Sequence, residues 1–149
     1  MSEVLFYHLE RQPLERVLPQ LLEKSLERGW RAVVQAGSAE RVDALDSALW
    51  TYRDESFLPH GTAKDPEPAA QPIFLTDADD NPNAAQVRFL VDGAQAGALT
   101  AYQRVVYIFD GRDEEAVAGA RQAWTRIKAD GHDATYWQQD EQGRWVKRA

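Results

Sequence analysis

The sequence predicts an α/β fold: a single domain with a mostly parallel sheet flanked by helices, Rossmann-like but without a phosphate-binding loop. Apolar residues switch repeatedly between short runs typical of buried strands and the three-to-four-residue spacing typical of helices. The 149 residues, 44% of them hydrophobic, suit one core. Because strands and helices alternate at short intervals, we expect βαβ units and parallel pairing over residues 1–149.

The first strand and helix follow directly from this pattern. Residues 4–7 (VLFY) form a short apolar run of strand formers, which predicts a buried strand. Apolar residues then recur at helical spacing from Pro13 to Leu26, and Gly29 follows as a C-terminal cap. Pro19 lies inside this stretch, where a proline costs about 3 kcal/mol. We therefore expect a kink or a fresh helix start there.

A second strand and helix lead into an irregular segment. Residues 30–36 (WRAVVQA) predict a strand, and Ser38 is placed to cap a helix whose inward stripe ends at Tyr52. Residues 53–71 are interrupted by prolines and a glycine and follow no regular period. A loop of this length in a compact domain is typically either mobile or functional.

The second half of the chain contains one further helix among short strands. The helix is predicted at 113–130, with Asp113 as N-cap, acidic residues in its first turn and Gly131 after its end. The predicted strands are residues 72–76, 87–92, 104–109, 135–138 and 145–147.

Composition and charge exclude several classes of protein. There is no cysteine, so the chain has no disulfide framework, thiolate nucleophile or cysteine-type zinc site. No run of 18 apolar residues and no signal-peptide order is present, which predicts a cytoplasmic protein. The net charge is −7, with 16 acidic and 9 basic residues in 1–103 but 8 of each in 104–149. This balance disfavours sequence-independent binding to duplex DNA.

The usual signatures of catalysis, nucleotides and metals are missing. The first strand–helix connection, His8–Pro13, contains no glycine, so backbone could not closely approach a pyrophosphate. Residues 77–88 begin like a calcium loop, but Pro82 replaces its glycine and Arg88 its bidentate glutamate. No histidine has ligand spacing, and Ser56 lacks a nucleophile elbow. We expect no catalytic residue, no metal and no cofactor.

The last long helix carries an unusual stripe of side chains. Between residues 116 and 129 there are three bases and no acid. Arg121, Trp124, Thr125 and Lys128 fall on one face, where two cations could hold a carboxylate and the ring could accept an apolar side chain. The alternative is that Trp124 belongs to the core and the bases are simply solvated.

Residues 49–61 (LWTYRDESFLPHG) form a second unusual segment. Trp50, Tyr52, Phe57 and Leu58 place several large apolar groups at a helix end and the start of a loop. They either cap the sheet or form a partner interface, where aromatic residues concentrate. Tyr136, Trp137 and Trp145 are interpreted as strand formers closing the sheet edge.

At these segments the sequence resembles the chi subunit of bacterial DNA polymerase III, nearly end to end. The block at 45–61 and the closing TYWQQ with its following G-x-W-V are the most specific parts. The matching segments are FYHL, LLEKSLERGWRAVV, LDSALWTYRDESFLPHG, QPIFLT, PNAAQVRFLVDGA, RVVYIFDG, AVAGARQAWTRIKADGH and TYWQQDEQGRWVKRA.

The resemblance implies a non-catalytic accessory subunit of the DNA polymerase III holoenzyme, within the clamp-loader assembly. Such a subunit binds the acidic C-terminal tail of the single-stranded-DNA-binding protein and is joined to the loader through a psi subunit. It contacts DNA only indirectly, has no small-molecule substrate and no membrane partner, and reaches the nucleoid through the replisome.

The resemblance also implies two sets of interface residues. The tail-binding set is Arg121, Trp124, Lys128, Phe109 and Thr125, the last at a position where some relatives carry lysine. The psi-type partner interface is Trp50, Phe57, Leu58 and Pro59.

Two other functions remain open from the residues alone. One is a direct single-strand binder that uses Arg121, Trp124 and Arg126 as a stacking groove. The other is a degenerate nucleotide-binding enzyme that keeps some affinity for its ligand. The adaptor is favoured because it explains an enzyme-like fold that lacks catalytic motifs.

Overall fold

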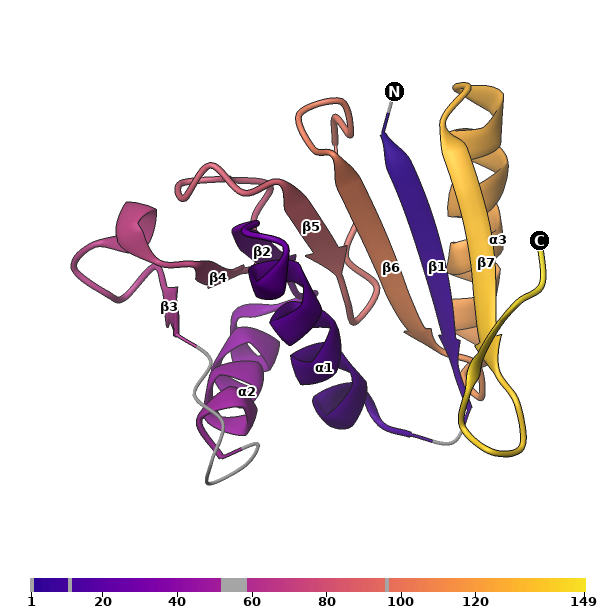
Figure 1. Cartoon of the computed structure of the whole chain (residues 1–149), viewed down its shortest axis with the longest axis horizontal. Helices are drawn as coiled ribbons and strands as arrows, with labels where there is room; N and C mark the ends of the chain where they lie inside the picture. The colour runs from indigo at the N-terminus through magenta and orange to yellow at the C-terminus, as the bar shows by residue number, and fades with distance from the viewer. Residues whose placement is uncertain (1, 11, 52–58, 96) are drawn as a thin grey trace.

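The computed structural model describes residues 2–10, 12–51, 59–95 and 97–149 (Figure 1). Within them, eight strands form one sheet in the order β3-β4-β2-β5-β6-β1-β7-β8, and every neighbouring pair is parallel except β7 with β8. The predicted mostly parallel sheet is confirmed. The strands are β1 Glu3–Leu9, β2 Ala32–Gln35, β3 His60–Thr62, β4 Ile73–Thr76, β5 Val87–Leu90, β6 Arg104–Asp110, β7 Asp133–Gln139 and β8 Trp145–Lys147.

Helices cover both faces of this sheet. The described α-helices are α1 Leu14–Glu27, α2 Ala39–Trp50 and α3 Glu114–Ala129, with a short 3-10 turn at Pro68–Ala70. Figure 1 shows α1 and α2 on one face and α3 behind the sheet, beside β7. Each face has its own hydrophobic core, built around α1 and α2 on one side and around α3 on the other. This is the two-faced arrangement expected from βαβ units.

The predicted helix caps are present. The Ser38 side chain accepts a hydrogen bond from the backbone N–H of Arg41, and Asp113 accepts from the first turn of α3. Gly29 and Gly131 follow α1 and α3 with φ of 81° and 83°, a conformation that favours glycine. Local sequence chemistry therefore defines these helix ends.

The structure differs from the sequence-based expectations at two places. Helix α1 continues through Pro19, so the alternative of a fresh helix start is wrong, and Pro19 is buried. The carbonyl that loses its partner belongs to Glu15, which is exposed, so water can replace the hydrogen bond. Residues 60–62 form the edge strand β3 beside β4, although the sequence shows no strand pattern there. Its pairing comes from the neighbouring strand and not from local periodicity.

The face of the sheet on which α3 lies is covered partly by this helix and partly by connecting segments. Helix α3 packs on β6 and β7. The other half of this face, over β4, β2 and β5, is covered by connecting segments that contribute Ala85, Leu99 and Tyr102 to the same core. The described residues of these segments form no helix, and side-chain contacts add to the few backbone hydrogen bonds that hold them, such as that from the Gln103 N–H to the Gln86 carbonyl at 2.9 Å.

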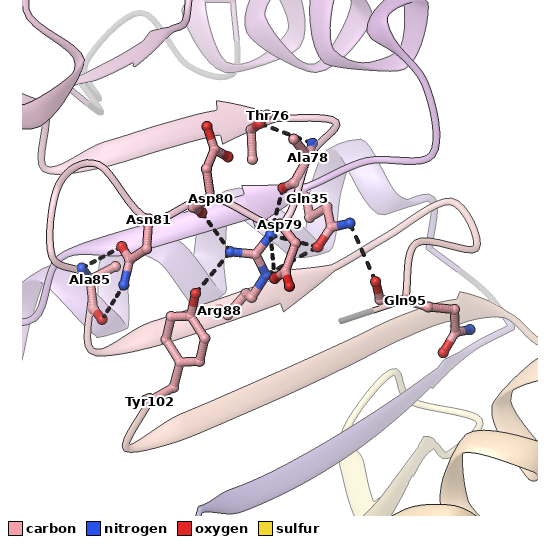
Figure 2. Close-up of polar contacts among 10 residues, drawn as sticks. All are labelled: Gln35, Thr76, Ala78, Asp79, Asp80, Asn81, Ala85, Arg88, Gln95 and Tyr102. Atoms are coloured by element: carbon pink, nitrogen blue, oxygen red, sulfur yellow. Dashed lines mark hydrogen bonds and ion pairs between the residues drawn. The ribbon is translucent and has the colours of Figure 1, made fainter. Parts of the chain in front are cut away.

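The guanidinium of Arg88 supplies those contacts (Figure 2). Arg88 lies in β5 with 0% of its surface exposed. It donates to Gln35 Oε1, to the Tyr102 hydroxyl at 2.9 Å, and to two carbonyls of the turn at 78–80 at 2.7 and 2.8 Å. Asp79 Oδ1 lies 3.6 Å away. The turn that begins like a calcium loop therefore folds around an arginine side chain.

We predict that Arg88→Met lowers the free energy of unfolding by about 3 kcal/mol or more, because it leaves several buried acceptors unpaired. Urea unfolding followed by circular dichroism measures the change. Arg112→Met is the matched control, since the Arg112 side chain is 73% exposed and, among the described residues, forms its ion pair with Asp110. A loss below about 1 kcal/mol for Arg88→Met would contradict this role.

A basic and aromatic site between α3 and β7

Helix α3 packs its apolar residues against the sheet and exposes its bases, Arg121, Arg126 and Lys128, to solvent. Ala120 and Ile127 are buried against β6 and β1, as expected for the inward face. Trp124 is only partly buried at the border of this core, beside β7. The two interpretations of Trp124, core residue and binding residue, are therefore both compatible with its position.

The Trp124 ring lies among other aromatic rings and one cation. Its centroid is 5.4 Å from that of Phe6 and 6.0 Å from that of Tyr136, both in edge-on geometry. Lys128 Nζ lies 5.4 Å above the Trp124 ring, within the range of a cation–π contact. The structure thus brings together Trp124 and Lys128, as the helical spacing predicts.

Arg121 lies one turn before Trp124 on the exposed side of α3. Burial raises the pKa of the Tyr136 hydroxyl, and the positive charge of Arg121 acts in the opposite direction. Within the described part of the chain, neither Arg121 nor Lys128 forms an ion pair. Thr125 donates its hydroxyl to the Arg121 carbonyl at 3.1 Å, so this hydroxyl is used within the helix.

Phe109 joins the site from the end of β6. Its ring lies 6.0 Å from Tyr136 and 5.2 Å from His8. Register explains the grouping: His8 is opposite Phe109, and Phe6 is opposite Tyr136, so all four side chains share the α3 face. We call Phe109, Arg121, Trp124, Thr125 and Lys128 the α3 site, and Tyr136 joins their aromatic members.

His8 and Tyr136 are the members that sequence reasoning missed. His8 Nδ1 lies 2.6 Å from the Tyr136 hydroxyl, and His8 Nε2 lies 3.3 Å from Glu10 Oε1. Gln138 donates to the same Glu10 oxygen at 2.6 Å. The alternation of apolar residues in the first and seventh strands could have placed them on one face, but not beside one another.

The described members of the predicted partner interface are Trp50, at the end of α2, and Pro59, just before β3, and α2 lies on the face of the sheet opposite α3 (Figure 1). Trp50, at the end of α2, is 54% exposed, and its ring lies 4.5 Å from that of His60. His60 Nε2 is 2.9 Å from Asp46 Oδ1. Pro59 is half-buried next to β3, whereas Phe57 and Leu58 lie outside the described residues. The described part of this surface, Trp50 and Pro59, is therefore separate from the α3 site.

A cavity of about 640 Å³ opens where the carboxyl ends of β1, β5 and β6 meet the starts of α1 and α3. In an α/β sheet this is the position at which nucleotides bind. Arg41 pairs there with Asp92 at 2.9 Å, and Arg112 with Asp110 at 3.2 Å. The acidic residues among the described lining are Glu15, Asp92, Asp110, Asp113 and Glu115, against only these two arginines. A phosphate would meet a net negative lining.

Two further findings concern other classes of site. In the described ranges, no three His, Cys, Asp or Glu side chains come together where they could hold a metal ion. Among the helices that the structure describes, none is long and apolar enough to cross a membrane.

Comparison with known proteins identifies a family. The sequence model described as DNA polymerase III chi subunit, HolC, matches residues 1–135. A curated relative from Rickettsia prowazekii (strain Madrid E), "Probable DNA polymerase III subunit chi", is 28% identical over 109 residues. The aligned part is 73% of this chain and 66% of the relative, just under two thirds of the relative's length.

The packing of His8 against Gly111 generates a prediction about the site. A Cβ added at Gly111 would lie 1.8 Å from His8 Nε2, so Gly111→Ala must displace the ring. We expect a loss of about 1–3 kcal/mol in urea unfolding, typical of overpacking. Gly119→Ala on α3 is the control: its Cβ would meet nothing within 4 Å. It should stabilise the protein by up to about 1 kcal/mol, and similar losses for both variants would contradict the prediction.

Proposed function

Since this chain belongs to the DNA polymerase III chi subunit family, we propose that it binds the acidic C-terminal tail of the single-stranded-DNA-binding protein and links it to the clamp loader through a psi-type subunit. In this role the chain is a non-catalytic accessory subunit of the polymerase complex. It acts in the cytoplasm, where the replisome brings it to the nucleoid.

The observation that carries the proposal is the pair of cations Arg121 and Lys128 on α3, which form no ion pair with any described residue and flank a partly exposed tryptophan in the helix. Arg121 can hold a carboxylate through two parallel hydrogen bonds, and Lys128 adds a second positive charge above the Trp124 ring. The uncharged Tyr136 and Phe109 rings lie next to them and offer apolar contact. A short peptide with carboxylates and a hydrophobic residue matches this combination.

The charge distribution favours a peptide over the alternatives. A protein with a net charge of −7 repels a long polyanion, whereas a short acidic peptide needs only the local field of one helix face. The acidic cavity at the ends of β1, β5 and β6 disfavours a nucleotide phosphate for the same reason. Both observations support an adaptor over a direct single-strand binder or a degenerate nucleotide-binding enzyme.

The psi-type contact is proposed for the surface around Trp50 and Pro59, together with Phe57 and Leu58 of the same segment. Exposed aromatic residues of this kind are enriched at the centres of interfaces. Because α2, which ends at Trp50, and α3 lie on opposite faces of the sheet, we expect two partners to bind without competing (Figure 1).

We predict that Arg121→Ala weakens binding of a labelled acidic tail peptide by at least about tenfold, the loss of one charge-assisted contact. Fluorescence anisotropy measures the affinity, and binding should weaken as salt screens the contact. Arg126→Ala is the control on the same helix, because Arg126 reaches toward Gln95 and not toward β7. Unchanged affinity in Arg121→Ala would reject this site.

The direct single-strand alternative is tested in the same assay with a bare oligonucleotide. If the protein is an adaptor, we expect the folded wild-type protein not to bind the oligonucleotide at physiological salt. Binding that is lost in both Arg121→Ala and Arg126→Ala would favour the stacking groove instead.

We further predict that Phe57→Ala and Trp50→Ala leave tail binding intact but weaken a psi-type partner by about tenfold or more, as expected for aromatic anchors. Pull-down and anisotropy with the two ligands separate the effects. Loss of both interactions together, with a changed circular dichroism spectrum, would show that the variant had unfolded. Unchanged partner binding in a folded variant would place that interface elsewhere.

A further inference from the structure

The residues after β8 bring a further cation next to the α3 site. The Arg148 N–H donates to the Tyr136 carbonyl at 2.7 Å, and the Tyr136 N–H donates to the Ala149 carbonyl at 3.3 Å. We propose that Arg148 is a third cation of this site and binds a carboxylate of an acidic peptide that lies across Tyr136. This inference rests on the proposed function and names a further residue that recognises the same ligand.

The register of the β7–β8 hairpin places Arg148 on the face of the sheet that carries α3. Strand β8 runs antiparallel to β7, with Lys147 opposite Trp137. The backbone hydrogen bonds of Tyr136 continue this pairing by one residue, so Arg148 lies opposite Tyr136. Opposite residues of an antiparallel pair share a face, with their Cβ atoms about 5 Å apart. Because Tyr136 packs against the core under α3, Arg148 belongs to that face too.

The aromatic rings of the site therefore lie between cations from two different elements. The Trp124 and Tyr136 rings are in edge-on contact, with their centroids 6.0 Å apart. On the helix side, Lys128 Nζ lies 5.4 Å above the Trp124 ring. On the other side, Arg148 follows β8, which comes after β7 in the order of the sheet. A peptide that lies over the Tyr136 ring meets a positive charge from each direction.

The Arg148 side chain is available to an external carboxylate. It is exposed and forms no ion pair with any residue that the structure describes. The acidic side chains at this end of the sheet have other partners: Glu10 accepts from Gln138 at 2.6 Å, and Asp140 accepts from two backbone N–H groups of its own turn at 2.9 Å. An arginine in this position can hold a carboxylate through two parallel hydrogen bonds.

The arrangement also describes the ligand more closely. With Arg121 and Lys128 on α3 and Arg148 across β7, the site suits a peptide that has carboxylates at more than one position and an apolar residue for the rings. The family model matches residues 1–135, so Arg148 lies in a part of the chain beyond that match.

The test is the affinity of the whole chain for a labelled acidic tail peptide, measured by fluorescence anisotropy at constant salt. Arg148→Ala should weaken binding by about fivefold or more, because a charge-assisted contact is lost. Lys147→Ala is the matched control, since it removes the same charge one residue earlier, opposite Trp137, whose ring lies 6.5 Å from that of Tyr7 on the other face. It should bind within about twofold of wild type, as expected for a screened surface charge.

A second measurement identifies the carboxylate that Arg148 binds. Each acidic residue of the peptide is replaced in turn by its amide, and each peptide is titrated with wild type and Arg148→Ala. One of these peptides should bind wild type more weakly and lose no further affinity in Arg148→Ala, the non-additivity expected of two groups in contact. Circular dichroism establishes that each variant is folded, and Arg148→Gln repeats the measurement with a longer side chain.

The outcomes separate this inference from the proposed function. No peptide binding by the folded wild-type protein overturns the proposed function and this inference with it. Peptide binding that stays within about twofold of wild type in Arg148→Ala leaves the proposed function standing and overturns the Arg148 contact. Equal losses in Arg148→Ala and Lys147→Ala also overturn it, because they would show an effect of net charge alone.

Discussion

The buried guanidinium of Arg88 fixes the segments that cover the sheet over β4, β2 and β5, next to the part of the same face that α3 covers. A charge removed from water costs several kcal/mol unless its donors are satisfied. Here Gln35, Tyr102 and two carbonyls of one turn satisfy them. The β4–β5 and β5–β6 connections are thereby packed on the face over β4, β2 and β5. Helix α3 can then lie over β6 and β7, where its outer side remains in solvent.

The α3 site combines two cations, Arg121 and Lys128, with aromatic rings from α3 and β7. Strand β7 presents the Tyr136 ring to Trp124 of α3, and Lys128 lies over the Trp124 ring. The close approach of His8 to Gly111 keeps the rings of the site in contact. Charges that are unpaired on a rigid helix are preorganised for an external carboxylate, which is what a peptide-binding adaptor requires.

The fold has a cavity at the position where α/β sheets bind nucleotides, but the residues that line it do not suit a phosphate. At the carboxyl ends of β1, β5 and β6 the described lining is mostly acidic, and no glycine-rich turn precedes α1. The surfaces that we propose for partners lie elsewhere, on the outer side of α3 and at the end of α2. In the function that we propose, the α/β sheet is a rigid spacer between two contacts, and that function is decided by sites and not by the fold.

The sequence by itself determined the features that depend on near neighbours in the chain. These include most strands, the caps at Ser38 and Asp113, and the shared helix face of Arg121, Trp124 and Lys128, because periodicity and capping act within a few residues. Only the tertiary structure decided the rest. Strand β3 exists because β4 pairs with it, and Arg88 is buried because distant segments satisfy it. His8 meets Tyr136 across 128 residues because β1 lies between β6 and β7, an order that no local pattern contains.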